Sequence, residues 1–164
     1  MMLETFSTRD TEYLFHAEAE DPVDLGVSTM HCGRRVDGVK LWLAWKHLGD
    51  QGWAALIDHY FELATHAETI INAHESLALV TPRPSLNLCF QYIPQHPDQN
   101  ANDLTLRIRT QLLEQGIAMV NYAEINGSIA FRLVICNNQT DKADIDAFFD
   151  ALVATGKRLE AEHV

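Results

Sequence analysis

Apolar residues recur at helical spacing over two adjoining stretches in the first half of the chain. The first stretch covers residues 35–47, and Gly49 follows it in position to end a helix. Asp50 can cap a second helix over residues 51–74. The apolar stripe of this second helix comprises Leu56, Tyr60, Leu63, Ala67, Ile70 and Ile71. Because the first helix is apolar over more than one face, we expect the pair to form a spine between separate layers.

From residue 76 onward, short strand-like runs alternate with helices. Strands are predicted over residues 77–80, 86–93, 117–122 and 129–136, and Asn126-Gly127 is a strong hairpin turn before the last of them. One helix is predicted between a cap at Asn102 and an end at Gly116, and a final helix follows a cap at Thr140. The order β-β-α-β-β-α predicts a small antiparallel sheet with helices on one face, which is an α+β fold.

Composition places the chain among folded proteins of ordinary domain size. The 164 residues are 47% hydrophobic and 21% charged, which is typical of a globular domain rather than a disordered chain. The formal net charge of -11 argues against binding to a nucleic-acid backbone or an anionic membrane. Because the sequence shows neither a membrane-spanning run nor a secretory signal pattern, we expect a cytoplasmic protein.

Most signatures of catalysis or metal binding are absent from the sequence. The sequence contains an odd number of cysteines, and they are widely spaced: Cys32, Cys89 and Cys136. This pattern predicts neither a disulfide framework nor a redox pair. His31 precedes Cys32, but a second pair of ligands is missing, so we expect no zinc site. The GxSxG, HExxH, P-loop and GxGxxG motifs are also missing. Lys40 and Lys46 lie beside the tryptophans of the first helix, and both are interpreted as surface or interface residues.

Arg132 interrupts the last predicted strand, which is otherwise apolar. Side chains alternate along a strand, so Arg132 should share one face with Ala130, Val134 and Cys136. A guanidinium on an apolar face is costly unless an anion meets it, and a carboxylate fits its planar fork. Two interpretations stay open at this point. Arg132 either binds an anionic ligand, or lies on an edge strand where it reaches water or a structural carboxylate.

A glycine-containing segment precedes the first helix. Gly33 permits close backbone approach, and Arg34 and Arg35 follow it just before the helix, where the dipole disfavours cations. These arginines therefore need acidic partners or an anion elsewhere. The segment is either a structural loop tied to carboxylates or a loop that lines a cleft.

Several segments together resemble one enzyme family, in the same order over nearly the whole chain. Residues 31–37 and 40–46 resemble "CGRxVD" and "KLWLxWK", and residues 87–94 resemble "NVCFWYIP". Residues 131–137 and 144–146 resemble "FRxVxxN" and "DID", and residues 12–15 contain "YLF". These motifs are similar to those of the pyridoxal-phosphate-dependent group II amino-acid decarboxylases of fold type I, glutamate and cysteine sulfinate decarboxylases above all.

The resemblance covers only the C-terminal third or so of such an enzyme. The family's cofactor lysine, its aspartate for the pyridine nitrogen and its ring-stacking histidine belong to motifs upstream of "YLF", and none is found here. The resemblance therefore implies that pyridoxal phosphate serves the intact enzyme but is not bound covalently by this chain alone, which should be inactive by itself.

Three site residues follow from the resemblance. Arg132 matches the arginine that binds the substrate's carboxylate, and Cys32 and Gly33 match a cleft-lining loop near the active site and the dimer interface. The loop after Pro94 lacks the Ser-Leu-Arg of animal enzymes, so the substrate stays open among glutamate, cysteine sulfinate and aspartate.

We therefore expect three parts: residues 1–34 as the tail of a large domain, 35–75 as a helical spine, and 76–164 as a C-terminal α+β domain. The predicted function is the C-terminal portion of a decarboxylase of acidic amino acids. The alternatives are a self-associating interaction module derived from such an enzyme, or one half of a split enzyme. The expected partners are a second copy of the chain, or a separate part that binds the cofactor.

Overall fold

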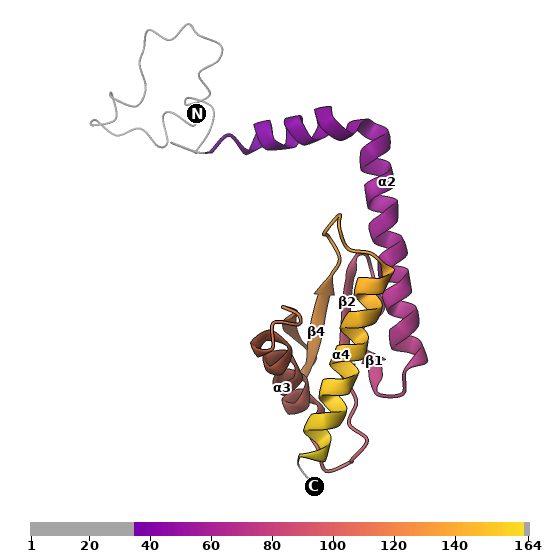
Figure 1. Cartoon of the computed structure of the whole chain (residues 1–164), viewed down its shortest axis with the longest axis vertical. Coiled ribbons are helices and arrows are strands. Elements are labelled where there is room, and N and C mark those ends of the chain that lie inside the picture. The colour runs from indigo at the N-terminus through magenta and orange to yellow at the C-terminus, as the bar shows by residue number, and fades with distance from the viewer. Residues whose placement is uncertain (1–34, 163–164) are drawn as a thin grey trace, which may run out of the picture. The chain divides into compact units, whose positions relative to one another are not determined.

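The computed structural model describes residues 35–162 (Figure 1). The chain divides into two compact units, Met1–Gly49 and Asp50–Val164. Helix α2 spans Asp37–Ala73, and its helical geometry is broken at Gly49, where φ is 66° and ψ is 178°. Glycine adopts a positive φ without the Cβ clash that other residues incur. The predicted break at Gly49 is confirmed.

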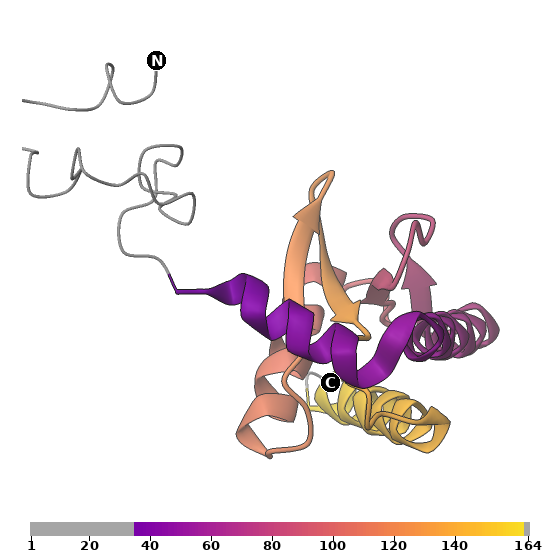
Figure 2. The same ribbon diagram turned by 90° about the horizontal axis from the view of Figure 1, so that it is seen from above.

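The second unit is built on a four-stranded antiparallel sheet with the order β1-β2-β4-β3. The strands are β1 Leu77–Leu79, β2 Asn87–Tyr92, β3 Asn121–Ile125 and β4 Ser128–Val134. Helix α3 (Ala101–Glu114) connects β2 to β3, and α4 (Lys142–Ala161) follows β4. Figure 2 shows α3 and α4 on one face of the sheet. The α+β fold and the antiparallel sheet predicted from the sequence are confirmed.

The third predicted strand is present, but its predicted bounds of 117–122 are wrong, because β3 begins only at Asn121 and ends at Ile125. Gly116 leaves the helix with a φ of 68°. The next two backbone N–H groups, of Ile117 and Ala118, then donate to the carbonyl of Leu112 at 3.0 and 3.3 Å. Residues 117 and 118 therefore satisfy the C-terminal carbonyls of α3 and are unavailable to the sheet.

The predicted cap of α3 is also wrong by two positions. Asn100 is the cap, and its side-chain oxygen accepts from the backbone N–H groups of Asn102 and Asp103. The side chain of Asn102 connects the helix to the sheet instead, accepting from the backbone N–H of Ile129 at 2.8 Å and from the amide of Gln91 at 2.7 Å. Asn102 therefore forms tertiary contacts between α3 and the sheet, and these contacts cannot be predicted from the neighbouring sequence.

Helix α4 begins one residue later than predicted. Asp141, and not Thr140, is its cap, and Asp144 completes a capping box with reciprocal hydrogen bonds of 3.0 Å. A carboxylate at this position also interacts favourably with the positive end of the helix dipole.

The core lies between the sheet and its helices. The rings of Phe90 and Phe131 from neighbouring strands lie 5.2 Å apart, and Phe149 of α4 lies 5.3 Å from Phe90. Helix α2 contributes Leu63, Ala64, Ala67 and Ile71 to the same cluster. The buried side chains of α2, α3, α4 and three of the strands thus form one continuous core.

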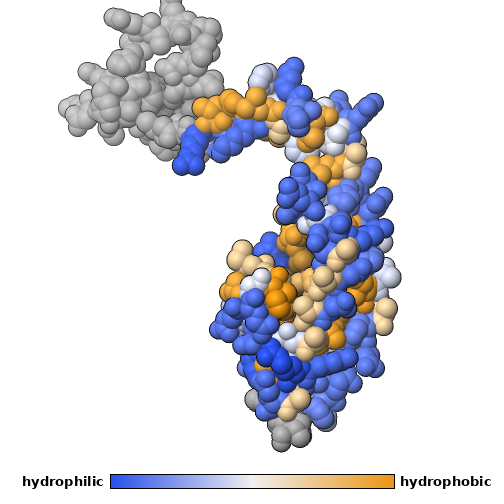
Figure 3. All heavy atoms as spheres, viewed as in Figure 1, coloured by the Kyte–Doolittle hydropathy of each residue, from blue (hydrophilic) through white to orange (hydrophobic). Residues whose placement is uncertain are grey.

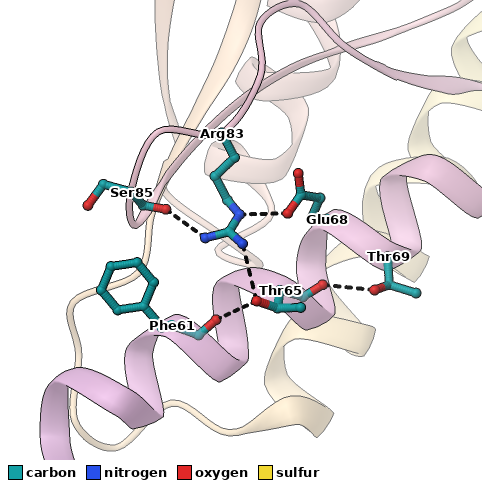
Figure 4. A network of polar contacts seen from close by, with 6 residues as sticks. All are labelled: Phe61, Thr65, Glu68, Thr69, Arg83 and Ser85. Carbon is teal, nitrogen blue, oxygen red and sulfur yellow. Dashed lines mark hydrogen bonds and ion pairs between the residues drawn. The ribbon is translucent and has the colours of Figure 1, made fainter.

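A network around Arg83 fastens the loop between β1 and β2 to α2 (Figure 4). The Nε atom of Arg83 donates to Glu68 at 2.7 Å, and its two terminal nitrogens donate to the carbonyl of Ser85 at 2.9 Å and to the hydroxyl of Thr65 at 3.2 Å. Each of the three nitrogens of this guanidinium therefore donates at least one hydrogen bond within the fold. None of the helices in the part of the chain that the structure describes is long and apolar enough to cross a bilayer.

Candidate carboxylate-binding site

Arg132 lies in the interior of the sheet, on β4, between β2 and β3. It is directly opposite Cys89 of β2 and Asn121 of β3. The interpretation that placed it on an edge strand is therefore wrong. Its side chain is nevertheless exposed, as are those of Val134 and Cys136 on the same face, whereas Ala130 is buried. The guanidinium is thus accessible to water, and burial does not by itself demand a partner for it.

Arg132 lines a hollow of about 330 Å³ at this end of the sheet. The other lining residues come from the loop before β3, from β3 and β4, and from α4: Ala118, Met119, Val120, Asn121, Leu133, Val134 and Phe148. Arg132 is the one charged residue among them. Met119 is 85% exposed and Val134 is 44% exposed, so the rim offers apolar surface beside the cation.

The guanidinium of Arg132 makes no hydrogen bond or ion pair with any other residue in the described range 35–162. Arginine remains charged at all ordinary pH values, and its fork matches the two oxygens of a carboxylate. A cation without a partner in this range, beside apolar walls, is suited to bind the carboxylate of a small molecule.

Arg109 of α3 holds one wall of the hollow in place. Its Nε atom donates to the carbonyl of Val120 at 3.0 Å, and its guanidinium carbon lies 5.4 Å from the centre of the Tyr122 ring. Contacts on both sides of Asn121 therefore restrain the start of β3. This restraint favours ligand binding, because less conformational entropy is lost from these residues when a ligand binds.

The described residues do not fit pyridoxal phosphate by themselves. A covalently held cofactor needs a lysine at the site, and a carboxylate to pair with the pyridine nitrogen. All four lysines of the sequence are exposed, and none lines the Arg132 hollow, whose described lining residues also include no carboxylate. Lys40 bonds to Asp37 at 3.0 Å, and Lys46 lies 5.8 Å from the Trp42 ring. The charge of the described lining residues is therefore better matched to an anion than to this cofactor.

Two of the predicted site residues, Cys32 and Gly33, lie outside the described residues, and their cleft-lining role stays a prediction. Within residues 35–162, no three His, Cys, Asp or Glu side chains gather as ligands for a metal ion.

Sequence reasoning missed the neighbours of Arg132. Phe148 and Met119 come from an α-helix and a loop whose contact with β4 is set by packing alone. The position of Asn121 could have been predicted from the sequence. A two-residue hairpin turn at Asn126-Gly127 pairs Ile125 with Ser128, and each further pair lies one residue farther from the turn on both strands. That register places residue 121 opposite Arg132, as the structure shows.

Comparison with known proteins identifies relatives of the whole chain. The model of the pyridoxal-dependent decarboxylase conserved domain matches residues 2–93. The chain is 32% identical over 162 residues to an L-aspartate decarboxylase, dtxS4, of Metarhizium robertsii, with 94% of this chain and 32% of the relative covered. It is likewise 32% identical over 160 residues to cysteine sulfinic acid decarboxylase of Mus musculus, covering 90% of this chain and 32% of the relative.

Solved structures of two decarboxylases are also similar to this chain. The apo crystal structure of mouse CSAD superimposes with a TM-score of 0.74 at 32% identity, covering 81% of this chain and 30% of that one. A tryptophan decarboxylase of Catharanthus roseus shares the fold, with a TM-score of 0.72 at 18% identity, and covers 85% of this chain and 29% of that one. The chain thus spans about a third of the length of the relatives it matches.

Proposed function

Because this chain belongs to the pyridoxal-dependent decarboxylase family, we propose that it provides the substrate-carboxylate site of an amino-acid decarboxylase through Arg132. One observation carries this proposal: a guanidinium without a partner in the described residues stands at an apolar hollow. In a decarboxylase, a cation of this kind would hold the substrate's carboxylate and so orient the amino acid.

The proposed substrates are acidic amino acids. The names of the two relatives refer to L-aspartate and to cysteine sulfinic acid, which are small and doubly acidic, and glutamate belongs to the same chemical class. The hollow contains a single cation, so the described residues account for one of the two acidic groups. We assign the second group to residues outside this range.

We further propose that the chain is inactive alone. All four lysines are exposed, and none of them lines the Arg132 hollow. They therefore do not offer the covalent anchor for the cofactor that the family's reaction needs. Catalysis would then require the cofactor-binding part of the enzyme. If that part is a separate polypeptide, the chain is one half of a split enzyme, and its co-expression with that half should generate the absorbance of a lysine–pyridoxal imine.

The binding proposal is tested on the full chain by NMR. The ¹⁵N-labelled protein is titrated with L-aspartate and with cysteine sulfinate, and the Arg132 Nε–H signal is followed. We expect this signal to shift with a saturable, millimolar dissociation constant, and Arg132→Met to abolish the effect. Arg158→Met is the matched control, because Arg158 is exposed and its guanidinium bonds, among the described residues, to Gln111 alone. An unchanged Arg132 signal at saturating ligand would overturn the proposal.

A specific observation supports self-association as a second candidate function. Leu41, Trp42, Leu43 and Trp45 in the first part of α2 are each about half exposed, between 48% and 58%, and Figure 3 shows hydrophobic surface along this part of the helix. Exposed apolar surface of this extent is typical of an interface. Light scattering should then show a mass that rises with concentration, and Trp42→Glu should lower it. A constant monomer mass would contradict this candidate.

A further inference from the structure

Asn121 occupies a special place beside Arg132. The two residues are directly opposite each other in the antiparallel pairing of β3 and β4. Opposed residues in such a pair point to the same face of the sheet, with Cβ atoms roughly 4.5–5.5 Å apart. Both side chains line the same 330 Å³ hollow. The residue that faces Arg132 from β3 therefore carries a carboxamide, whereas the residue that faces it from β2 is Cys89.

One hydrogen bond determines which way this carboxamide is turned. The backbone N–H of Tyr122 donates to Oδ1 of Asn121 at 2.8 Å. A backbone N–H can donate only to the oxygen of an amide, so the Oδ1 and Nδ2 positions are assigned by chemistry. The Nδ2 group is left with both of its hydrogens, and it donates to no other residue in the described part of the chain.

The surroundings give this amide a fixed position. Arg109 holds the residues on either side of it, through the carbonyl of Val120 and the ring of Tyr122. Asn121 itself is exposed, so a ligand in the hollow can reach it. The remaining described residues that line the hollow are apolar, so within residues 35–162 Asn121 and Arg132 are its two sources of hydrogen-bond donors from side chains.

We propose that Asn121 is a second substrate-binding residue, whose Nδ2 donates to the same carboxylate that Arg132 binds. The inference rests on the function proposed above and assigns one more residue to that site. A carboxylate has about four lone-pair positions, and the fork of an arginine satisfies two of them. An amide donor from the facing strand satisfies a third and restricts rotation of the carboxylate about the guanidinium.

Two variants at position 121 separate binding from structure. Asn121→Asp keeps an oxygen to accept from Tyr122 but replaces the donor with an anionic oxygen. That oxygen repels a carboxylate and pairs with Arg132, so we expect L-aspartate binding to weaken at least tenfold. Asn121→Ala removes the donor without adding charge, and we expect about three- to tenfold weaker binding, as for the loss of one hydrogen bond. Asn72→Ala, an exposed change on α2, should leave the binding unchanged.

The test is the same NMR titration of the full chain with L-aspartate, followed at Arg132 Nε–H and at Asn121 Nδ2. We expect both signals to shift with one dissociation constant. If Asn121→Asp and Asn121→Ala bind as tightly as the unchanged chain while Arg132→Met does not bind, the inference about Asn121 is wrong and the function proposed for Arg132 stands. If the unchanged chain shows no shift at Arg132, the proposed function itself fails. A purely structural role for Asn121 predicts that Asn121→Ala lowers the free energy of unfolding in urea, whereas the proposed donor role predicts weaker binding by Asn121→Ala at unchanged stability.

Discussion

Gly156 of α4 lies against the ring of Tyr92, so close that a Cβ atom at this position would collide with the ring carbons. Both residues are buried, and Tyr92 belongs to the core cluster. The absence of a side chain at position 156 therefore lets α4 pack directly on β2. This contact couples the last helix to the second strand of the sheet.

Gly156→Ala should destabilise the second unit by about 1–3 kcal/mol, because the added methyl group must displace a fully buried ring. Urea unfolding followed by circular dichroism measures the change. Gly38→Ala is the matched control, since a Cβ there meets nothing within 4 Å and alanine is the better helix former. An equal effect of the two substitutions would contradict the close packing of α4 on β2.

The Tyr92 hydroxyl should make stability depend on alkaline pH. Burial raises the pKa of this hydroxyl above 10.0, and the charge of the neighbouring Glu160 adds to the rise. The unfolded chain therefore loses this proton at lower pH than the folded chain does. The resulting contribution to stability is fully present below pH 10 and is lost as the pH rises through the folded pKa.

Tyr92→Phe is the variant that tests this dependence. We expect the unchanged chain to lose stability to urea more steeply than Tyr92→Phe between pH 9 and 11. At pH 7 the substitution should cost little, because the buried hydroxyl makes no hydrogen bond of standard geometry although Ser76 and Glu160 lie beside it. Identical pH profiles would show that the hydroxyl is not shielded from water.

Arg83→Lys should destabilise the second unit by about 1–2 kcal/mol, even though it preserves the charge. Lysine cannot reproduce the three directions in which Arg83 donates to Glu68, Ser85 and Thr65. The midpoint of urea unfolding measures the loss. Arg158→Lys serves as the control, because the side chain of that exposed arginine makes a single 3.2 Å bond within the described part of the chain. Its replacement should change the free energy of unfolding by no more than about 0.5 kcal/mol. Equal midpoints for the two variants would mean that the network contributes little.

Arg132→Met should leave stability within about 0.5 kcal/mol of the unchanged chain, in contrast to Arg83. The guanidinium of Arg132 is exposed and has no partner in residues 35–162, so its removal breaks nothing in the fold. The same urea experiment measures this. A loss above 1 kcal/mol would indicate that Arg132 supports the structure, which is the role that the binding proposal denies it.

The sequence by itself determined the order of elements and the points where the chain turns. The helical spacing of α2, the break at Gly49 and the turn at Asn126-Gly127 depend on residues close together in the chain, so local patterns were sufficient. The family was also within reach, because its motifs are short and keep their order.

Only the tertiary structure decided which strands are neighbours and which side chains water can reach. The position of β4 inside the sheet, the exposure of Arg132 and the contribution of Phe148 to its hollow depend on contacts between distant segments. The caps at Asn100 and Asp141 were missed for a related reason. Several polar residues stood near each helix start. At α3 the sheet engages the side chain of Asn102 and leaves the cap to Asn100, whereas at α4 the reciprocal pair Asp141 and Asp144 forms the cap.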